Sequence, residues 1–279
     1  MGEGTYYQVV LTISSLLRQI TPPVLRSFLK GLVRKNAYIW EGIHSRYEDV
    51  PAVGDGFNGD YWIRRTRSYT EETLKASGQY GFIPSGVSGE HLILPLLASL
   101  ECKSRGEVNI LDFGGGMGIA YIHTVSSLVN CQSVNFHIVE SQRITEEGMR
   151  LFAHDKRIHF HSKLPAELPN LDIIYMSSAL QYVEDYTSLL KTLAGYGAKY
   201  FLFVKLSAGD FQTYATAQKN VPGSTLPYWF INVKEIVEIM AAGGYSLIYK
   251  SALEQEYDQD NFPQEYRLGR TSNLLFSRN

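Results

Sequence analysis

The stretch Asn109-Ile110-Leu111-Asp112-Phe113-Gly114-Gly115-Gly116-Met117-Gly118 decides the fold of this chain. The apolar run over residues 108–111 is typical of a buried strand, and the apolar periodicity of residues 119–129 predicts a helix. A glycine-rich turn between a strand and a helix is where open α/β sheets bind ligands. Glycine is needed where the chain turns tightly, or where a ligand comes too close to the backbone for a Cβ. We therefore expect a ligand to lie against main chain at this turn.

The spacing of the glycines separates two classes of ligand. A dinucleotide-binding turn, G-x-G-x-x-G, would need a glycine at position 119, which is Ile. The third glycine is instead Gly118, and Asp112 stands two residues before the first one. This G-x-G-x-G pattern resembles the S-adenosylmethionine (SAM) loop of class I methyltransferases. SAM carries an ammonium and a sulfonium group and no phosphate, so a nearby carboxylate suits it better than it suits a pyrophosphate.

A second carboxylate follows the next predicted strand. Residues 134–139 form an apolar run that ends at Glu140. An acid at the end of the second strand is placed to accept hydrogen bonds from the ribose hydroxyls of a bound nucleoside. NAD and SAM enzymes share this feature, so Glu140 supports an adenosine ligand without choosing between the two.

The order of the predicted elements indicates an α/β fold. Helices are expected over residues 87–101, 117–130, 142–154, 183–195 and 233–242, and strands over residues 108–111, 133–139, 157–161, 171–176, 199–206, 245–252 and 271–277. Strands that alternate with helices form parallel βαβ units with right-handed crossovers. No helix separates the last two strands, which implies one antiparallel strand near the sheet edge. We expect a Rossmann-like, mostly parallel sheet of seven strands.

Two regions are expected in the chain. Residues 1–85 would form an amphipathic helix and then, over residues 36–85, an irregular, aromatic-rich cap or lid over the cofactor. Residues 86–279 would form the SAM-binding domain. Long connections leave the carboxyl ends of strands at residues 177–182, 207–232 and 253–270, and long ordered loops at that edge are usually functional. The aromatic residues of the second connection would either form an acceptor wall or pack the loop down.

Residues 21–35 form an amphipathic segment, in which Pro22 and Pro23 suit a helix start. One face is apolar, and basic residues lie off that face. Such a helix either rests on an anionic membrane surface or packs on the main domain, and the second arrangement is favoured. Residues 1–20 lack the features of a secretory signal, and no apolar run is long enough to span a membrane. A cytoplasmic protein is expected, with peripheral contact to the inner membrane through residues 21–35 as the open alternative.

Composition excludes other classes. The 279-residue chain has a formal net charge of −2 and no run of Lys and Arg with interleaved aromatics, so nucleic acid is not an expected partner. Cys102 and Cys131 lack metal-ligand spacing and are expected to be reduced structural thiols. His159 and His161 share one face of a strand but lack a third ligand, so no metal site is expected.

Nearly the whole chain resembles the SAM-dependent methyltransferases of bacterial surface-polysaccharide (O-antigen type) gene clusters. The matching stretches are Thr21-Pro22-Pro23-Val24-Leu25, Trp40-Glu41-Gly42, Tyr47-Glu48-Asp49, residues 111–118, Ile138-Val139-Glu140, Ser177-Ser178-Ala179-Leu180-Gln181-Tyr182, residues 218–228 and Gly244-Tyr245. The glycine loop is specific to the superfamily only, whereas the Pro-Pro and Trp-Glu-Gly elements narrow the resemblance to this group. The resemblance implies O-methylation of a sugar, or of a nucleotide- or lipid-linked glycan intermediate.

The resemblance also implies a set of cofactor-binding residues. Gly114, Gly116 and Gly118, with Asp112, would line the methionine end of SAM, and Glu140 would bind its ribose. The full expected set is Asp112, Gly114, Gly115, Gly116, Gly118, Glu140, Ser162 and Lys163 beside the adenine, and Ser177 beneath the cofactor.

The candidates for a role in catalysis are Gln181, Lys205 and His161. Plant-type O-methyltransferases carry a general-base His where this chain has Gln181, and Gln can orient a nucleophile but cannot take its proton. Lys205, at the end of the fifth strand, either holds an acidic group of the acceptor or is structural. His161 is a more distant candidate base. Glu184 and Asp185 fall in the first turn of a predicted helix, where they would complement its dipole.

Two other functions stay open at this point. The missing base is compatible with a catalytically silent protein that organises a polysaccharide assembly complex and that binds SAM without transferring a methyl group. An NAD-dependent oxidoreductase is the third possibility. It would bind NADH and would need a hydride-transfer partner, which the sequence does not reveal.

Overall fold

The computed structural model describes residues 38–80, 92–168, 170–252 and 257–279. The chain divides into two units, Met1–Tyr38 and Ile39–Asn279, and every described residue except Tyr38 belongs to the second. The amphipathic segment at 21–35 and the predicted boundary between residues 85 and 86 lie outside the described residues. Within those residues, no helix combines the length and the apolar character needed to cross a bilayer.

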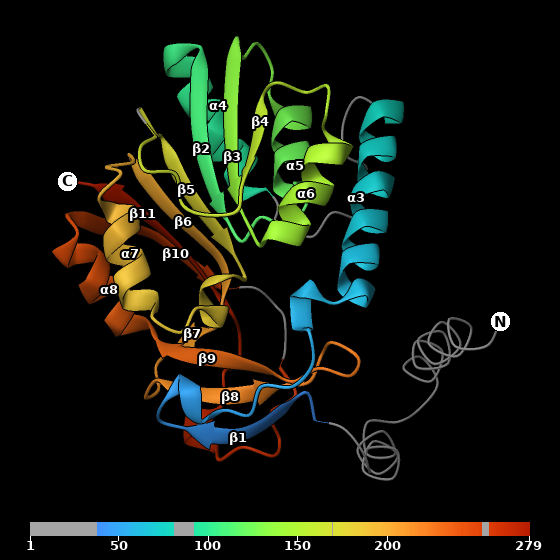
Figure 1. The fold of residues 1–279 in the computed structure, drawn as a ribbon. Helices are drawn as coiled ribbons and strands as arrows, with labels where there is room; N and C mark the ends of the chain where they lie inside the picture. Colours follow the sequence, from blue (N-terminus) through green and yellow to red (C-terminus); the bar gives the residue numbers. More distant parts are fainter. Residues whose placement is uncertain (1–37, 81–91, 169, 253–256) are drawn as a thin grey trace, which may run out of the picture. The chain divides into compact units, whose positions relative to one another are not determined.

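A seven-stranded sheet with the order β10-β11-β6-β5-β2-β3-β4 forms the centre of the second unit (Figure 1). Its strands are β2 (Glu107–Phe113), β3 (Ser133–Val139), β4 (Ile158–His161), β5 (Ile173–Ser177), β6 (Tyr200–Leu206), β10 (Tyr245–Ala252) and β11 (Ser272–Arg278). Strands β4, β3, β2, β5 and β6 pair in parallel, whereas β11 runs antiparallel to both β6 and β10. The predicted sheet with one antiparallel strand is confirmed.

The strand order reverses beside β2. From β2 the chain proceeds outward to β3 and β4, and then crosses to β5 on the other side of β2. In open α/β sheets the crevice at the carboxyl ends of the strands on either side of such a reversal is the usual ligand site. The topology therefore points to the ends of β2 and β5.

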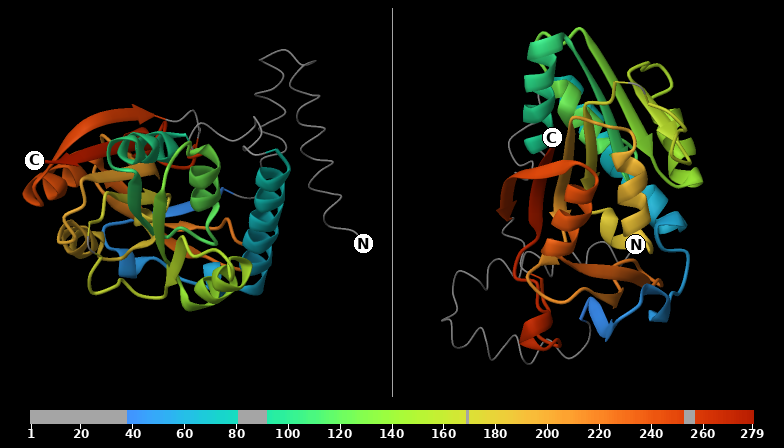
Figure 2. Two further views of the ribbon diagram at one scale, coloured as in Figure 1. Left: turned by 90° about the horizontal axis from the view of Figure 1, so that it is seen from above. Right: turned by 90° about the vertical axis from the view of Figure 1, so that its left-hand side faces the viewer.

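Helices cover both faces of this sheet (Figure 2). They are α3 (Asp60–Tyr80), α4 (Ile93–Arg105), α5 (Ile119–Ser127), α6 (Gln142–Leu151), α7 (Tyr186–Ala194) and α8 (Val233–Ala242). Neighbouring strand residues enter different cores, because successive side chains of a strand point to opposite faces. Ile110 packs with residues of α4 and α5, while Leu111 belongs to the cluster that contains residues of α7 and α8. The sheet is thus buried on both sides along its parallel strands, as their near-continuous apolar runs require, whereas the edge strand β10 is mostly exposed.

Helix α3 corrects the expectation that residues 36–85 are irregular. Its inward stripe keeps helical spacing but carries hydroxyl side chains, with Thr70 fully buried and Thr73 nearly so. Thr70 Oγ1 and Thr73 Oγ1 donate to the carbonyls of Thr66 and Tyr69, 2.9 and 2.8 Å away. Bonds of this kind satisfy a buried hydroxyl within its own helix. A stripe of threonines gives no apolar periodicity, so the prediction was wrong here.

A second sheet corrects the expectation of a long loop at residues 207–232. Its order is β1-β8-β9-β7, formed by β1 (Trp40–His44), β7 (Ala208–Gly209), β8 (Tyr214–Gln218) and β9 (Leu226–Asn232). Two short 3₁₀ turns, η1 (Tyr47–Asp49) and η2 (Gly56–Asn58), follow β1. Most aromatic residues of the 207–232 segment pack the second sheet. Phe211, Tyr214, Tyr228 and Phe230 belong to a buried cluster that also contains Trp40, Phe262 and Leu268.

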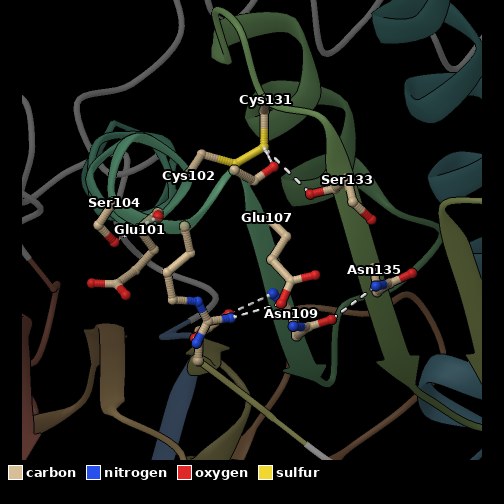
Figure 3. A network of polar contacts seen from close by, with 11 residues as sticks. Glu101, Cys102, Ser104, Glu107, Asn109, Cys131, Ser133 and Asn135 are labelled. Atoms are coloured by element: carbon tan, nitrogen blue, oxygen red, sulfur yellow. Dashed lines mark hydrogen bonds and ion pairs between the residues drawn. A yellow bond between two sulfur atoms is a disulfide. The ribbon is translucent and has the colours of Figure 1, made fainter.

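A disulfide joins Cys102 at the end of α4 to Cys131 before β3, with 5.4 Å between the Cα atoms (Figure 3). The expectation of two reduced thiols was wrong, because the 29-residue separation carries no spacing signal. The turn at Gly106 brings the two segments together. Its N–H donates to the Cys102 carbonyl, and its own carbonyl accepts from the N–H groups of Gln132 and Ser133.

We expect the Cys102→Ser variant to unfold more easily than the wild type by about 2–4 kcal/mol, because it loses a cross-link that restricts the unfolded chain. Denaturant unfolding under non-reducing conditions measures the difference. Reductant should bring the wild type close to the variant and leave the variant unchanged. A wild-type protein whose stability does not respond to reductant would contradict this prediction.

Candidate functional site

A cavity of about 430 Å³ lies at the carboxyl ends of β2, β3 and β5. The glycine turn, the end of β3 and the segment after β5 contribute one part of its lining, and η2, α3, the 3₁₀ turn η4 (Leu180–Tyr182) and the β8–β9 loop contribute the rest. The lining residues are Phe57, Trp62, Thr66, Phe113, Gly114, Gly116, Glu140, Ser177, Ser178, Ala179, Tyr182, Val183 and Asn220. The predicted residues Gly114, Gly116, Glu140 and Ser177 therefore meet in one cavity, at the strand reversal.

The three motif glycines serve different purposes. A Cβ at Gly114 would lie 2.5 Å from the Ala179 Cβ, and one at Gly118 would lie 3.1 Å from Ile158 Cδ1. These two positions exclude side chains because protein atoms already fill the space. A Cβ at Gly116 would meet only Thr66, at 3.8 Å. Gly116, with a φ of +57°, is thus the motif glycine whose missing side chain leaves room beside the cavity.

Asp112 lies beneath the turn and is not among the residues that line the cavity. Its side chain is 1% exposed, and neither carboxylate oxygen has a hydrogen-bond partner in the described part of the chain. Burial, and secondarily the charge of Glu140, holds the pKa of Asp112 well above its usual value. A Cβ at Gly115 would lie 2.4 Å from Asp112 Oδ2, so this glycine is required by the buried acid.

Glu140 lines the cavity from the end of β3. Its Oε2 accepts a hydrogen bond from the Ser141 N–H at 2.5 Å, and its own N–H donates to the His161 carbonyl at 3.0 Å. Burial raises the pKa of Glu140, and the bond from Ser141 opposes this shift. An ionised carboxylate has several lone-pair directions, so Glu140 can also accept hydrogen bonds from a ligand.

The structure does not bring Ser162, Lys163 or His161 into this cavity. All three line a separate hollow beside α6, and Gln142 lines the same hollow. The His161 ring stacks on His137, and His161 Nε2 lies 3.0 Å from His137 Nδ1. Burial lowers the pKa of His161, and it lowers the pKa of His137 to about 4. These contacts assign His161 to a packed stack of imidazoles.

Gln181 and Lys205 also lie outside the cavity lining, but Gln181 supports a residue within it. The buried Gln181 Nε2 lies 3.0 Å from Ser178 Oγ, 3.2 Å from the Tyr228 hydroxyl and 3.3 Å from the Lys205 carbonyl. Ser178 and Lys205 both have a φ of +53°, which is strained for residues other than glycine. The Gln181 amide therefore holds two strained strand ends together. Burial lowers the pKa of the half-buried Lys205.

Nine lining residues were not among the predicted site residues. Phe113, Ser178 and Ala179 lie within two residues of predicted ones, in the glycine turn and at the end of β5, and the other six are Phe57, Trp62, Thr66, Tyr182, Val183 and Asn220. Only a general expectation of an aromatic lid or acceptor wall anticipated them. Phe57 contacts both Trp62 and Tyr182, with ring centroids 4.8 Å apart in each pair. No periodicity marks these positions, because the residues come from separate elements.

No protein-family model and no curated protein matches this sequence. Among solved structures, it is similar to a chain in a complex between the Haloferax volcanii Trm112 methyltransferase activator and a methyltransferase, with 12% identity, 81% of this chain and 96% of that chain covered, and a TM-score of 0.50.

Two further structures are similar to the chain. Burkholderia thailandensis 1,6-didemethyltoxoflavin-N1-methyltransferase, solved with bound S-adenosylhomocysteine, has 13% identity, covers 82% of this chain and 95% of its own, and gives a TM-score of 0.47. Magnesium protoporphyrin IX methyltransferase from Synechocystis has 12% identity, covers 78% of this chain and 99% of its own, and gives a TM-score of 0.46. With the strand order, the likeness to the Haloferax complex shows that the described chain has the class I methyltransferase fold.

We expect the ligand-free Asp112→Asn variant to be more stable than the wild type at pH 7, by about 1–3 kcal/mol, because it removes the cost of burying or neutralising an acid that has no hydrogen-bond partner. The pKa of Asp112 is raised in the folded state, so the folded protein binds the proton more tightly than the unfolded chain does. Wild-type stability should fall as the pH rises from about 4 through that raised pKa. The variant should lack this fall.

Thermal unfolding between pH 4 and pH 8 measures both effects. Asp210→Asn is the control, because Asp210 is 79% exposed in a surface pair with Lys234 and should change stability little. Parallel pH profiles for the wild type and Asp112→Asn would refute the assignment.

Proposed function

We propose that this chain binds SAM and is a SAM-dependent methyltransferase. One observation carries the proposal. The space beside Gly116 and the carboxylate of Glu140 share a single cavity at the reversal of the strand order. That arrangement offers bare main chain and an anionic hydrogen-bond acceptor together, where an open α/β sheet binds nucleosides.

The residues present fit SAM. Glu140 can accept hydrogen bonds from the two ribose hydroxyls, and Gly116 leaves the main chain accessible to the methionine part. The unpaired Asp112 carboxyl lies directly under the turn, so its ionised form would favour a positively charged ligand above it. A pyrophosphate would be repelled by the carboxylates of Asp112 and Glu140, and the described lining contains no Lys, Arg or His to balance its charge.

The chemistry follows from the lining. When bound, SAM supplies an electrophilic methyl group, and transfer breaks its bond to sulfur as a bond to the acceptor forms. The protein holds the acceptor in line and excludes water. Ser177 and Ser178 lie at the end of β5, where they can donate to or accept from either ligand.

For the acceptor, we propose a sugar or a nucleotide- or lipid-linked glycan intermediate of surface-polysaccharide synthesis, methylated on oxygen. The support for the class is the resemblance to methyltransferases of such gene clusters. For a lipid-linked acceptor, the segment at 21–35 would serve as a peripheral membrane contact, which is the alternative to the favoured packing on the main domain.

One observation favours a second candidate, a catalytically silent SAM-binding protein of a polysaccharide assembly complex. Within the described part of the lining, Glu140 is the sole carboxylate and no histidine is present. A hydroxyl acceptor must lose a proton during methylation, and Gln181 cannot take it. Incubation with isotope-labelled SAM and lipid-linked or nucleotide-sugar extracts separates the two candidates, since a labelled product would exclude the silent one.

We expect Glu140→Gln to weaken S-adenosylhomocysteine binding by about 10- to 100-fold, because hydrogen bonds to a charged group contribute roughly 1.5–3 kcal/mol. Titration calorimetry measures the affinity. Glu238→Gln, on the exposed side of α8, is the matched control and should leave the affinity unchanged. Wild-type protein that binds NADH, or that fails to bind S-adenosylhomocysteine, would overturn the proposed function.

A further inference from the structure

We infer that Trp62, with Phe57 and Tyr182, forms an aromatic wall that binds the acceptor as an uncharged sugar ring. This inference rests on the proposed function, because it assigns the part of the cavity that the cofactor leaves open. The three residues come from α3, η2 and η4.

The aromatic wall is a continuous surface. Phe57 lies between the other two rings, 4.8 Å from Trp62 at an interplanar angle of 51° and 4.8 Å from Tyr182 at 85°. None of the three rings is fully buried, and all three line the cavity. Rings in these tilted and edge-on arrangements pack favourably with one another and still offer apolar surface to a ligand.

Each ring is held in place from behind. The Tyr182 hydroxyl donates to Gln218 Oε1 on β8 at 2.8 Å, and its ring packs edge-on against Tyr228 at 4.9 Å. Trp62 packs against the small core of Ile63, Met117 and Ile144. These contacts fix the wall before a ligand arrives, which reduces the entropy that binding would cost.

The turn that carries Phe57 is also fixed. The N–H of Gly56 donates to Ser224 Oγ at 3.1 Å, and a Cβ at Gly56 would lie 2.5 Å from Leu226 Cδ2. Both partners lie on or just before β9. The second sheet therefore positions the wall over the carboxyl end of the main sheet.

The wall belongs to the acceptor and not to the cofactor. The groups suited to a nucleoside, Glu140 and the main chain at Gly116, follow the strands of the main sheet. The aromatic rings, by contrast, come from elements inserted before β2, and from η4. A cofactor bound along the strand ends leaves the aromatic wall as the surface available to a second ligand.

The chemistry of the lining identifies the class of that ligand. Besides the rings, the polar groups are neutral, from Thr66, Ser177, Ser178 and Asn220, once Glu140 is assigned to the cofactor. A phosphate or carboxylate at the reacting end would have no counter-ion in the described lining, and burying an unpaired charge is costly. A pyranose ring offers an apolar C–H face for the aromatic wall and hydroxyls for the neutral groups.

The test uses full-length protein saturated with S-adenosylhomocysteine. Neutral methyl pyranosides of several hexoses are titrated and followed by saturation-transfer NMR, beside a methyl uronoside and a planar phenol. We expect the neutral pyranosides to bind, and Trp62→Ala to weaken them at least tenfold while the affinity for S-adenosylhomocysteine stays within about twofold. Trp62→Phe, which keeps an aromatic face, should retain part of the affinity and guards against a folding defect in the alanine variant.

Tyr61→Ala is the matched control, because Tyr61 is the neighbouring residue on α3, is 44% exposed and does not line the cavity. It should bind pyranosides like the wild type. The inference fails if Trp62→Ala keeps its pyranoside affinity, if it weakens S-adenosylhomocysteine equally, or if only the uronoside or the phenol binds. Each of these results leaves the proposed SAM-dependent methyltransferase standing, whereas failure of the wild type to bind S-adenosylhomocysteine removes both that proposal and the inference.

Discussion

The buried carboxylate of Asp112 constrains the glycine turn that lies above it. Asp112 needs Gly115 to have no side chain, and it finds no hydrogen-bond partner in the described chain. Its burial stabilises the neutral form, so the ligand-free protein holds this acid at a cost in folding free energy. Unpaired buried groups of this kind persist where function requires them. The cost is understandable if a positively charged ligand binds above the turn and favours the ionised acid.

The strand ends of the main sheet form the cofactor end of the cavity, but they leave its other side open. Helix α3 and the second sheet, which come from segments far apart in the sequence, close that side. Strand β1 pairs with β8, and the Tyr47 hydroxyl donates to the carbonyls of Tyr182 and Pro227. The segment of β1 and η1 therefore contacts both the β8–β9 insertion and η4. Under the proposed function, acceptor selection depends on how β1 and the β8–β9 insertion fit each other.

The features that could be predicted from the sequence are those with a local signal. The apolar strand before Gly114, the helix after Gly118 and the acid at Glu140 follow from neighbouring residues, and the structure brings both Gly114 and Glu140 to the cavity. The inward stripe of α3 was missed because Thr70 and Thr73 replace apolar residues. Ser162 and Lys163 line a separate hollow, so their predicted place beside the adenine stays a prediction. Phe57 and Trp62 fall in the segment that was expected to form an aromatic lid, but their meeting with Tyr182 could not be predicted, since these residues come together only after the second sheet has formed.

The backbone at the ends of β5 and β6 holds the lining groups of the cavity in defined positions, although the cavity has no obvious general base. Ser178 and Lys205 are both held in the left-handed region, and the Ser178 N–H donates to the Val204 carbonyl at 2.9 Å. One buried amide, that of Gln181, contacts both strained residues and the Tyr228 hydroxyl of the second sheet. Strain of this kind persists only where surrounding contacts over-determine the geometry. Gln181 thus links the Ser178 hydroxyl, which lines the cavity, to Tyr228 in the second sheet, which supports the aromatic wall. This arrangement fixes the orientation of the lining groups and supplies no general base.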